Sequence, residues 1–219
     1  MANPAALSLR EHFRTPEQQR ETSSIGMWIF IITEVMLFSG LFMAFTVYRS
    51  MYPQAFIEGS AEMSIALGAT NTIVLICSSF TMALSVYSAA TGNRRMLAIF
   101  LIATMILGAA FLGIKFTEYY QHYRDHQAPG VWFDWRGRDA AQVEMFFVFY
   151  FIMTGLHAVH MFVGEGLLFT MLLRTAAGSF SARYHTPVEL VVLYWHFVDI
   201  VWVFLFAIFY IEGLHLHHG

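Results

Sequence analysis

Apolar residues fall into five long, charge-poor windows, approximately residues 26–48, 63–88, 96–119, 143–173 and 188–211. A helix needs about 20 mainly apolar residues to cross about 30 Å of hydrocarbon. A transmembrane β-strand needs only about ten residues and alternates polar with apolar positions, which these windows do not. The pattern therefore predicts an all-α polytopic membrane protein with five transmembrane helices in a bundle.

The remaining segments are polar and short. Residues 1–25 contain three arginines, three glutamates and no apolar signal-peptide core, so we interpret them as a polar cytoplasmic N-terminal segment. Residues 26–219 contain no fixed-period repeat or flexible linker and are expected to form one five-helix membrane domain. The longest connection, residues 120–142, mixes aromatic with charged residues, as is typical of a membrane interface.

Basic residues are distributed unevenly between the two sides that five spans would create. The N-terminal side carries seven, namely Arg10, Arg14, Arg20, Arg94, Arg95, Arg174 and Arg183. The opposite side carries four, namely Arg49, Arg124, Arg136 and Arg138. Because cytoplasmic loops are enriched in Lys and Arg, we predict a cytoplasmic N-terminus. The C-terminus, with His215, His217 and His218, is then expected on the other side.

Composition narrows the class further. The chain is 58% hydrophobic and only 12% charged, against about 25% charged in a typical soluble domain. Its net charge of −3, without a basic block, gives no support for a nucleic-acid partner. The single cysteine, Cys77, excludes an internal disulfide and cysteine-ligated metal clusters.

Ionisable residues inside apolar windows are costly and usually face protein or water, so they are the candidate functional groups. Glu34 lies about eight residues inside the first window, without a basic residue on that helix. Two interpretations are equally open. One is a proton-exchanging or lipid-contacting carboxylate, and the other is a protonated carboxyl group that fixes packing against a neighbouring helix.

Three histidines lie within the predicted membrane region. His157 and His160 are three residues apart and are expected to share a helical face. Together with His196 they are too few for a two-haem membrane cytochrome, so metal binding is disfavoured. A di-iron site would need two Glu-x-x-His motifs, and the chain has one, from Glu212 to His215.

Two further polar pairs have the same three-residue spacing. His196 and Asp199 are expected to hydrogen-bond to each other, preferentially as a structural lock rather than as a proton relay. Lys115 and Glu118 lie near the end of the third window and are expected to be structural, with both side chains able to snorkel to the interface. The role of Glu165 is left open.

Four elements together resemble subunit III of the haem-copper respiratory oxidases, in the cytochrome c oxidase line. In chain order they are the Glu34 span, Glu118-Tyr119-Tyr120, the Gly-Leu-His-Ala-Val-His run at 155–160 and the Trp-His-Phe-Val-Asp-Ile-Val-Trp run at 195–202. The resemblance extends from about residue 25 to the C-terminus. Family members commonly have seven helices, so this chain looks like the shorter five-helix bacterial form.

The resemblance implies an accessory subunit of the bacterial cytoplasmic membrane, with no haem or copper of its own. The haems and copper lie in partner subunits. It implies direct packing on subunit I, with subunit II, small subunits or a supercomplex as further partners. It also implies bound phospholipid and a role in proton uptake and stability during turnover. Glu34 matches the buried carboxylate of the family, and His157, His160, His196 and Asp199 match its structural positions, whereas Lys115 and Glu165 depart from the pattern.

The resemblance also implies a reaction for the whole complex, in which electrons pass from reduced cytochrome c to oxygen while protons cross the membrane. Two alternatives within the family are a quinol oxidase subunit and the accessory chain of a nitric oxide reductase. Outside the family, a stand-alone transporter would use the intramembrane charges as a substrate path. The sequence contains no inverted repeat that would favour such a transporter.

Overall fold

The structure is a computed structural model that describes residues 13, 15–130, 133–135, 137, 139–180 and 184–211. Several residues used in the sequence predictions lie outside the described residues, namely Arg10, Arg14, Arg136, Arg138, Arg183, Glu212, His215, His217 and His218.

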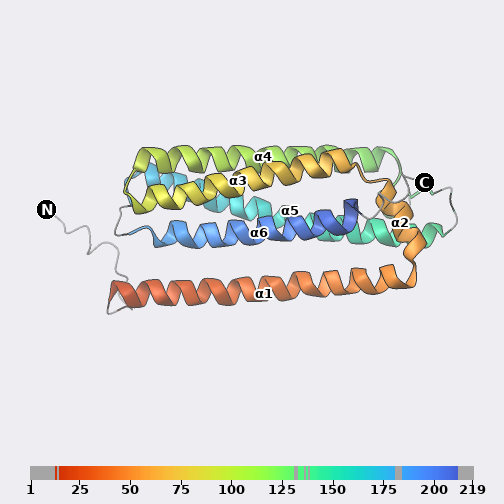
Figure 1. The fold of residues 1–219 in the computed structure, drawn as a ribbon, viewed down its shortest axis with the longest axis horizontal. Coiled ribbons are helices and arrows are strands. Elements are labelled where there is room, and N and C mark those ends of the chain that lie inside the picture. Colours follow the sequence, from red (N-terminus) through yellow and green to blue (C-terminus); the bar gives the residue numbers. More distant parts are fainter. Residues whose placement is uncertain are drawn as a thin grey trace.

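The described residues form six helices and no strand (Figure 1). They are α1 (Pro16–Met51), α2 (Pro53–Ala61), α3 (Ile65–Ala90), α4 (Arg94–Arg124), α5 (Ala140–Ala176) and α6 (Thr186–Tyr210). All except α2 are long and apolar enough to cross a membrane. The all-α class and the five spans are therefore confirmed, whereas α2 was not predicted.

The first helix begins earlier than its apolar window. The Thr15 hydroxyl accepts a hydrogen bond from the backbone N–H of Gln18, which caps the start of α1. Residues 16–25 of the predicted polar segment are therefore helical. Arg20 on this extension lies 3.3 Å from a carboxylate oxygen of Glu189, near the start of α6, so the polar ends of the two helices are linked.

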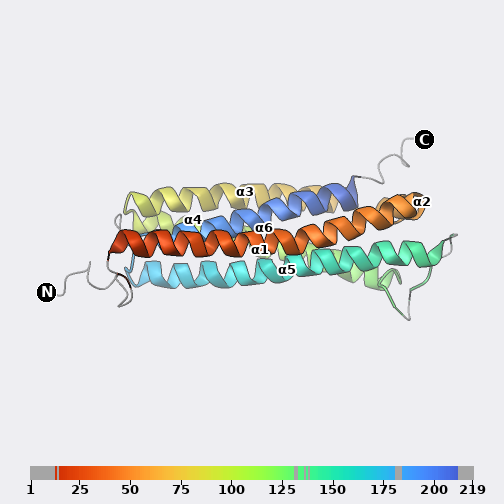
Figure 2. The same ribbon diagram turned by 90° about the horizontal axis from the view of Figure 1, so that it is seen from below.

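Four of the long helices form a closed ring and the fifth lies outside it. Helix α3 packs on α4 and α6, and α5 completes the ring by packing on α4 and α6. Helix α1 contacts α5 and α6 but neither α3 nor α4, and Figure 2 shows it lying across α5 and α6. Accordingly only 11% of its most apolar stretch is buried, against 56% for α6. A large apolar surface of α1 is thus free for lipid or protein.

Aromatic side chains close one end of the bundle. The buried ring of Phe45 on α1 lies 5.2 Å from Phe56 of α2 and 5.1 Å from Phe209 of α6, both in edge-to-face geometry. The Ser60 hydroxyl of α2 donates to the backbone carbonyl of Phe209 at 2.8 Å. Helix α2 therefore joins α1 to the end of the ring instead of forming a loose connection.

A tight turn joins α3 to α4. Gly92 adopts φ +73°, a left-handed conformation that favours glycine. The Asn93 side chain then accepts from the backbone N–H of Met96 and caps α4. This turn sets the antiparallel alignment of α3 and α4, on which the positions of their polar groups depend.

Candidate functional site

Glu34 of α1 pairs with His160 of α5 across the helix interface. The Oε2 atom of Glu34 lies 2.9 Å from Nε2 of His160. The other ring nitrogen of His160, Nδ1, lies 2.8 Å from the backbone carbonyl oxygen of Leu156. Because a carbonyl oxygen can only accept, Nδ1 carries a proton and donates it. The Glu34–His160 bond therefore holds one further proton, on the carboxyl group or on Nε2.

Neighbouring side chains hold the Glu34–His160 pair in position but leave both side chains partly exposed. The buried Phe38 ring lies 5.3 Å from the imidazole, and the Tyr194 hydroxyl donates to the backbone carbonyl of His160 at 2.9 Å. The side chains of His160 and Glu34 remain 12% and 17% exposed. The pair is therefore less enclosed than a fully buried pair would be.

The sequence predicted a shared helical face for His157 and His160, and the structure gives the two side chains different surroundings. Only His160 hydrogen-bonds to α1. His157 is buried, with its ring 5.5 Å from Phe111 and 5.4 Å from Trp202. Neither of its ring nitrogens has a hydrogen-bond partner within the described residues. The partner of Glu34 was missed because it lies 126 residues further along the chain.

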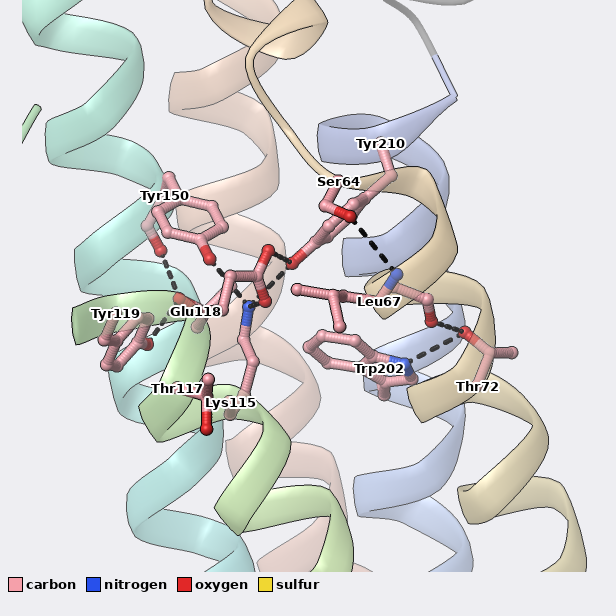
Figure 3. Close-up of polar contacts among 12 residues, drawn as sticks. Ser64, Leu67, Thr72, Lys115, Thr117, Glu118, Tyr119, Tyr150, Trp202 and Tyr210 are labelled. Carbon is pink, nitrogen blue, oxygen red and sulfur yellow. Dashed lines mark hydrogen bonds and ion pairs between the residues drawn. The ribbon is translucent and has the colours of Figure 1, made fainter. Parts of the chain in front are cut away.

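Lys115 and Glu118 form the centre of a second, fully enclosed group (Figure 3). Lys115 Nζ lies 2.9 Å from Glu118 Oε2, and donates to the hydroxyls of Tyr150 at 2.8 Å and Tyr210 at 2.7 Å. Tyr210 in turn donates to the second carboxylate oxygen of Glu118 at 2.5 Å. The ammonium group also lies 5.1 Å from the centre of the Trp202 ring. These contacts join α4, α5 and α6.

The prediction that Lys115 and Glu118 can snorkel to the membrane interface is wrong. Lys115 is 2% exposed and Glu118 is 1% exposed, so neither snorkels. The partners that make burial tolerable are Tyr150 and Tyr210, whose hydroxyls satisfy the charges inside the bundle. The sequence does show these two tyrosines in otherwise apolar windows. It does not show that they lie beside Lys115, because they belong to other helices.

A row of side-chain hydrogen bonds joins α3 to α6. Trp195 donates to Ser78 at 2.8 Å, Trp202 donates to Thr72 at 3.1 Å, and Ser79 lies 2.8 Å from Nδ1 of His196. The predicted His196–Asp199 hydrogen bond is absent. His196 turns to Ser79 of α3 instead.

Glu165 lies at a close approach of α4 and α5. Its Oε1 is buried beside Gly108 and lacks a hydrogen-bond partner within the described part of the chain. Across the described ranges, no three His, Cys, Asp or Glu side chains come close enough to hold a metal ion.

Fold and site together define a polytopic helical membrane protein, built as a ring of four helices with a fifth on its outer side. Its buried polar groups mostly join helices. One group, the Glu34–His160 pair, is partly exposed and joins the outer helix to the ring.

Comparison with known proteins gives the family. Residues 14–214 match the family model for cytochrome c oxidase subunit III. The cytochrome c oxidase subunit 3 of Thermostichus vulcanus is 31% identical over 188 residues, which are 85% of this chain and 86% of the relative. The chain therefore belongs to the subunit III family of haem-copper oxidases, and the resemblance seen in the sequence is confirmed.

Two further relatives show the breadth of this family. The quinol oxidase subunit 3 of Bacillus spizizenii is 28% identical over 206 residues, covering 90% of this chain and 92% of the relative. The cytochrome c oxidase subunit 3 of Tachyglossus aculeatus aculeatus is 32% identical over 195 residues, covering 86% of this chain and 69% of the relative. The family thus contains subunits of both kinds of oxidase.

Proposed function

We propose that this chain is an accessory subunit that packs on catalytic subunit I of a haem-copper terminal oxidase and carries no redox centre of its own. The haems and copper lie in partner subunits. This assignment is supported by how its histidines are used, because His160 bonds Glu34, His196 bonds Ser79 and His157 lies between aromatic rings. The three imidazole rings therefore have separate surroundings and do not converge on one position where a haem or copper could bind.

The Glu34–His160 pair is the observation that carries the proposed role in turnover. It keeps one exchangeable proton at the α1–α5 interface, on the helix with the most free surface. A partially exposed proton store is suited to supply a neighbouring proton path. We therefore assign to this pair a supporting role in proton uptake, and to the enclosed Lys115–Glu118 group a structural one.

An apolar groove between α1 and α6 is the candidate site for phospholipid. Its volume is about 680 Å³. The wall is almost wholly apolar, with Phe38 and Phe42 from α1 and Phe197 and Phe204 from α6. An acyl chain fits such a surface because it needs no hydrogen-bond partner. Lipid held here would lie one turn along α1 from Glu34.

The proposed electron donor of the complex is cytochrome c, in the cytoplasmic membrane of a bacterium. The quinol alternative is supported by the Bacillus relative, and the donor binds other subunits in either case. The N-terminus is proposed to be cytoplasmic. Helices α1 and α6 agree with the expected opposite termini, since α1 begins at one end of the bundle and α6 ends at the other (Figure 1).

The test compares the oxidase complex with and without this chain. Oxygen consumption is followed over many turnovers with reduced cytochrome c and, separately, with a quinol. The proposed role predicts normal initial activity and faster loss of activity without the chain, with recovery when the purified chain is added back. Equal durability of both preparations would overturn it.

A further inference from the structure

A small pocket lies in the bend where α1 passes into α2, and we call it the elbow pocket. Its volume is about 270 Å³, and it is lined by Thr46, Arg49 and Ser50 of α1 and by Pro53 and Ile57 of α2. Figure 2 shows α2 continuing from the end of α1. Because Thr46 also lines the α1/α6 groove, the apolar groove and the elbow pocket meet at this residue.

Arg49 gives the elbow pocket a positive charge. The residue is exposed and lies in the last turn of α1. The hydroxyls of Thr46 and Ser50 donate to carbonyl groups of their own helix, so the guanidinium is the side-chain donor of this pocket. A guanidinium has five N–H donors, can serve more than one acceptor, and matches the oxygens of a phosphate group. The pocket therefore suits a phosphate better than an uncharged ligand.

The start of α2 adds to this charge. The helix begins at Pro53, on the wall of the pocket, and no side chain caps its first turn. A helix start carries a partial positive charge, which here is not neutralised by a capping side chain. Arg49 and the first turn of α2 therefore favour the same kind of ligand.

The α1/α6 groove has the length of one bilayer leaflet. Along α1 its lining residues run from Val35 to Thr46, which is about 16 Å at about 1.5 Å per residue. Half of the hydrocarbon core is about 15 Å thick. An acyl chain that enters the groove at the elbow pocket can therefore reach the middle of the membrane, beside Glu34.

The two spaces together require a ligand with two parts. A free phosphate would occupy the elbow pocket and leave the groove unfilled, whereas an uncharged apolar molecule would occupy the groove and leave Arg49 unused. A phospholipid combines an anionic phosphate at the membrane interface with an acyl chain that extends toward the bilayer centre. Both the charge of the pocket and the length of the groove fit this one molecule.

We propose that the elbow pocket and the α1/α6 groove together bind one phospholipid of the leaflet in which α1 ends. Arg49 holds its phosphate, and one acyl chain lies in the groove. This proposal rests on the proposed function, which places lipid in the groove. It goes further by assigning the headgroup site, the leaflet and the direction of the bound lipid.

The test counts the phospholipids that remain on the intact oxidase complex after detergent washing, by native mass spectrometry. The Arg49→Gln variant removes the positive charge and should lose one phospholipid per copy of the chain. The Arg49→Lys variant keeps the charge and should retain it. Arg124→Gln is the matched control, because Arg124 is an exposed arginine in the last turn of α4, at the same end of the bundle (Figure 1). This control should lose none.

A second pair of variants tests the groove. Ser39→Trp places a large ring in the groove, and Met36→Trp adds the same ring on α1 at a 70% exposed residue that does not line it. Ser39→Trp should lose the same phospholipid as Arg49→Gln, and the double variant should lose no more. Met36→Trp should lose none.

The outcomes separate this site from the proposed function. An unchanged lipid count in Arg49→Gln would overturn the headgroup site, even where Ser39→Trp loses a lipid from the groove. A phosphate signal that depends on Arg49 but survives Ser39→Trp would identify free phosphate as the ligand and overturn the phospholipid. Failure of the chain to co-purify with haem would instead overturn the proposed function.

Discussion

The carboxyl group of Glu34 and the imidazole of His160 are joined by a 2.9 Å hydrogen bond between α1 and α5. The bond crosses between the outer helix and the four-helix ring. Since Nδ1 of His160 donates to the backbone carbonyl of Leu156, the bond to Glu34 is made through Nε2. The pair anchors α1, and we propose that it also holds the proton used in turnover.

The Glu34→Gln variant separates these two functions. Its amide can still donate to Nε2, so assembly should be intact and the free energy of unfolding should change by about 1 kcal/mol or less. It cannot exchange a proton, so proton uptake during turnover should slow if the carboxyl group takes part in it. Oxygen consumption and proton uptake measured across pH test this, with exposed Glu21→Gln as the control. Unchanged behaviour at every pH would reject a protonic role and leave packing as the function of Glu34.

The Lys115→Met variant tests the enclosed charged group. It leaves the carboxylate of Glu118 buried with only the Tyr210 hydroxyl as a partner. We expect a loss of about 3–5 kcal/mol in the free energy of unfolding, because an uncompensated charge remains inside the bundle. The double variant Lys115→Met/Glu118→Leu should recover much of this loss. Detergent-induced unfolding measures both. A single variant as stable as the wild type would show that the ion pair contributes nothing.

The Gly164→Ala variant tests the close packing of α5 on α6. A Cβ atom at this position would lie 2.9 Å from the buried Trp195 ring, which has no room to move. Overpacking should lower the free energy of unfolding by about 1–3 kcal/mol. Gly166→Ala, two residues away with open space around it, should be neutral or slightly stabilising. Equal stability of the two variants would contradict the packing described for Trp195.

The Ser79→Ala variant tests the hydrogen bond between α3 and His196. Removing the hydroxyl leaves Nδ1 of the imidazole without its partner and should cost about 1 kcal/mol of stability. Thr70→Ala removes an exposed hydroxyl of α3 that bonds only its own helix, and should have a smaller effect. The difference between the two unfolding free energies is the measurement, and a larger loss in the Thr70 variant would exclude the proposed bond.

The sequence predicted the spans because each one is encoded locally, by a run of apolar residues long enough to cross the membrane. It did not predict α2, because nine residues that bury Phe56 and Ser60 against distant helices carry no comparable local pattern. Spacing also identified Lys115 with Glu118 correctly, since residues three apart on one helix share a face and can meet.

Spacing was insufficient where a partner comes from another helix. His196 and Asp199 satisfy the same three-residue rule, yet His196 bonds Ser79, 117 residues earlier in the chain. The pairing of Glu34 with His160 likewise depends on how α1 packs against α5, which the amino-acid pattern does not determine. Buried polar residues were therefore recognised as important from the sequence, but their partners required the packed structure.

Separating this chain from its complex tests the proposed accessory role most directly. The complex is purified in mild detergent, this chain is stripped off, and reduced-minus-oxidised spectra of both fractions are recorded together with oxygen consumption. All haem signal should stay with the remaining subunits, and their oxygen consumption should decay faster during turnover than that of the intact complex. Haem in the isolated chain, or a chain that purifies without any haem-containing subunit, would contradict an accessory role.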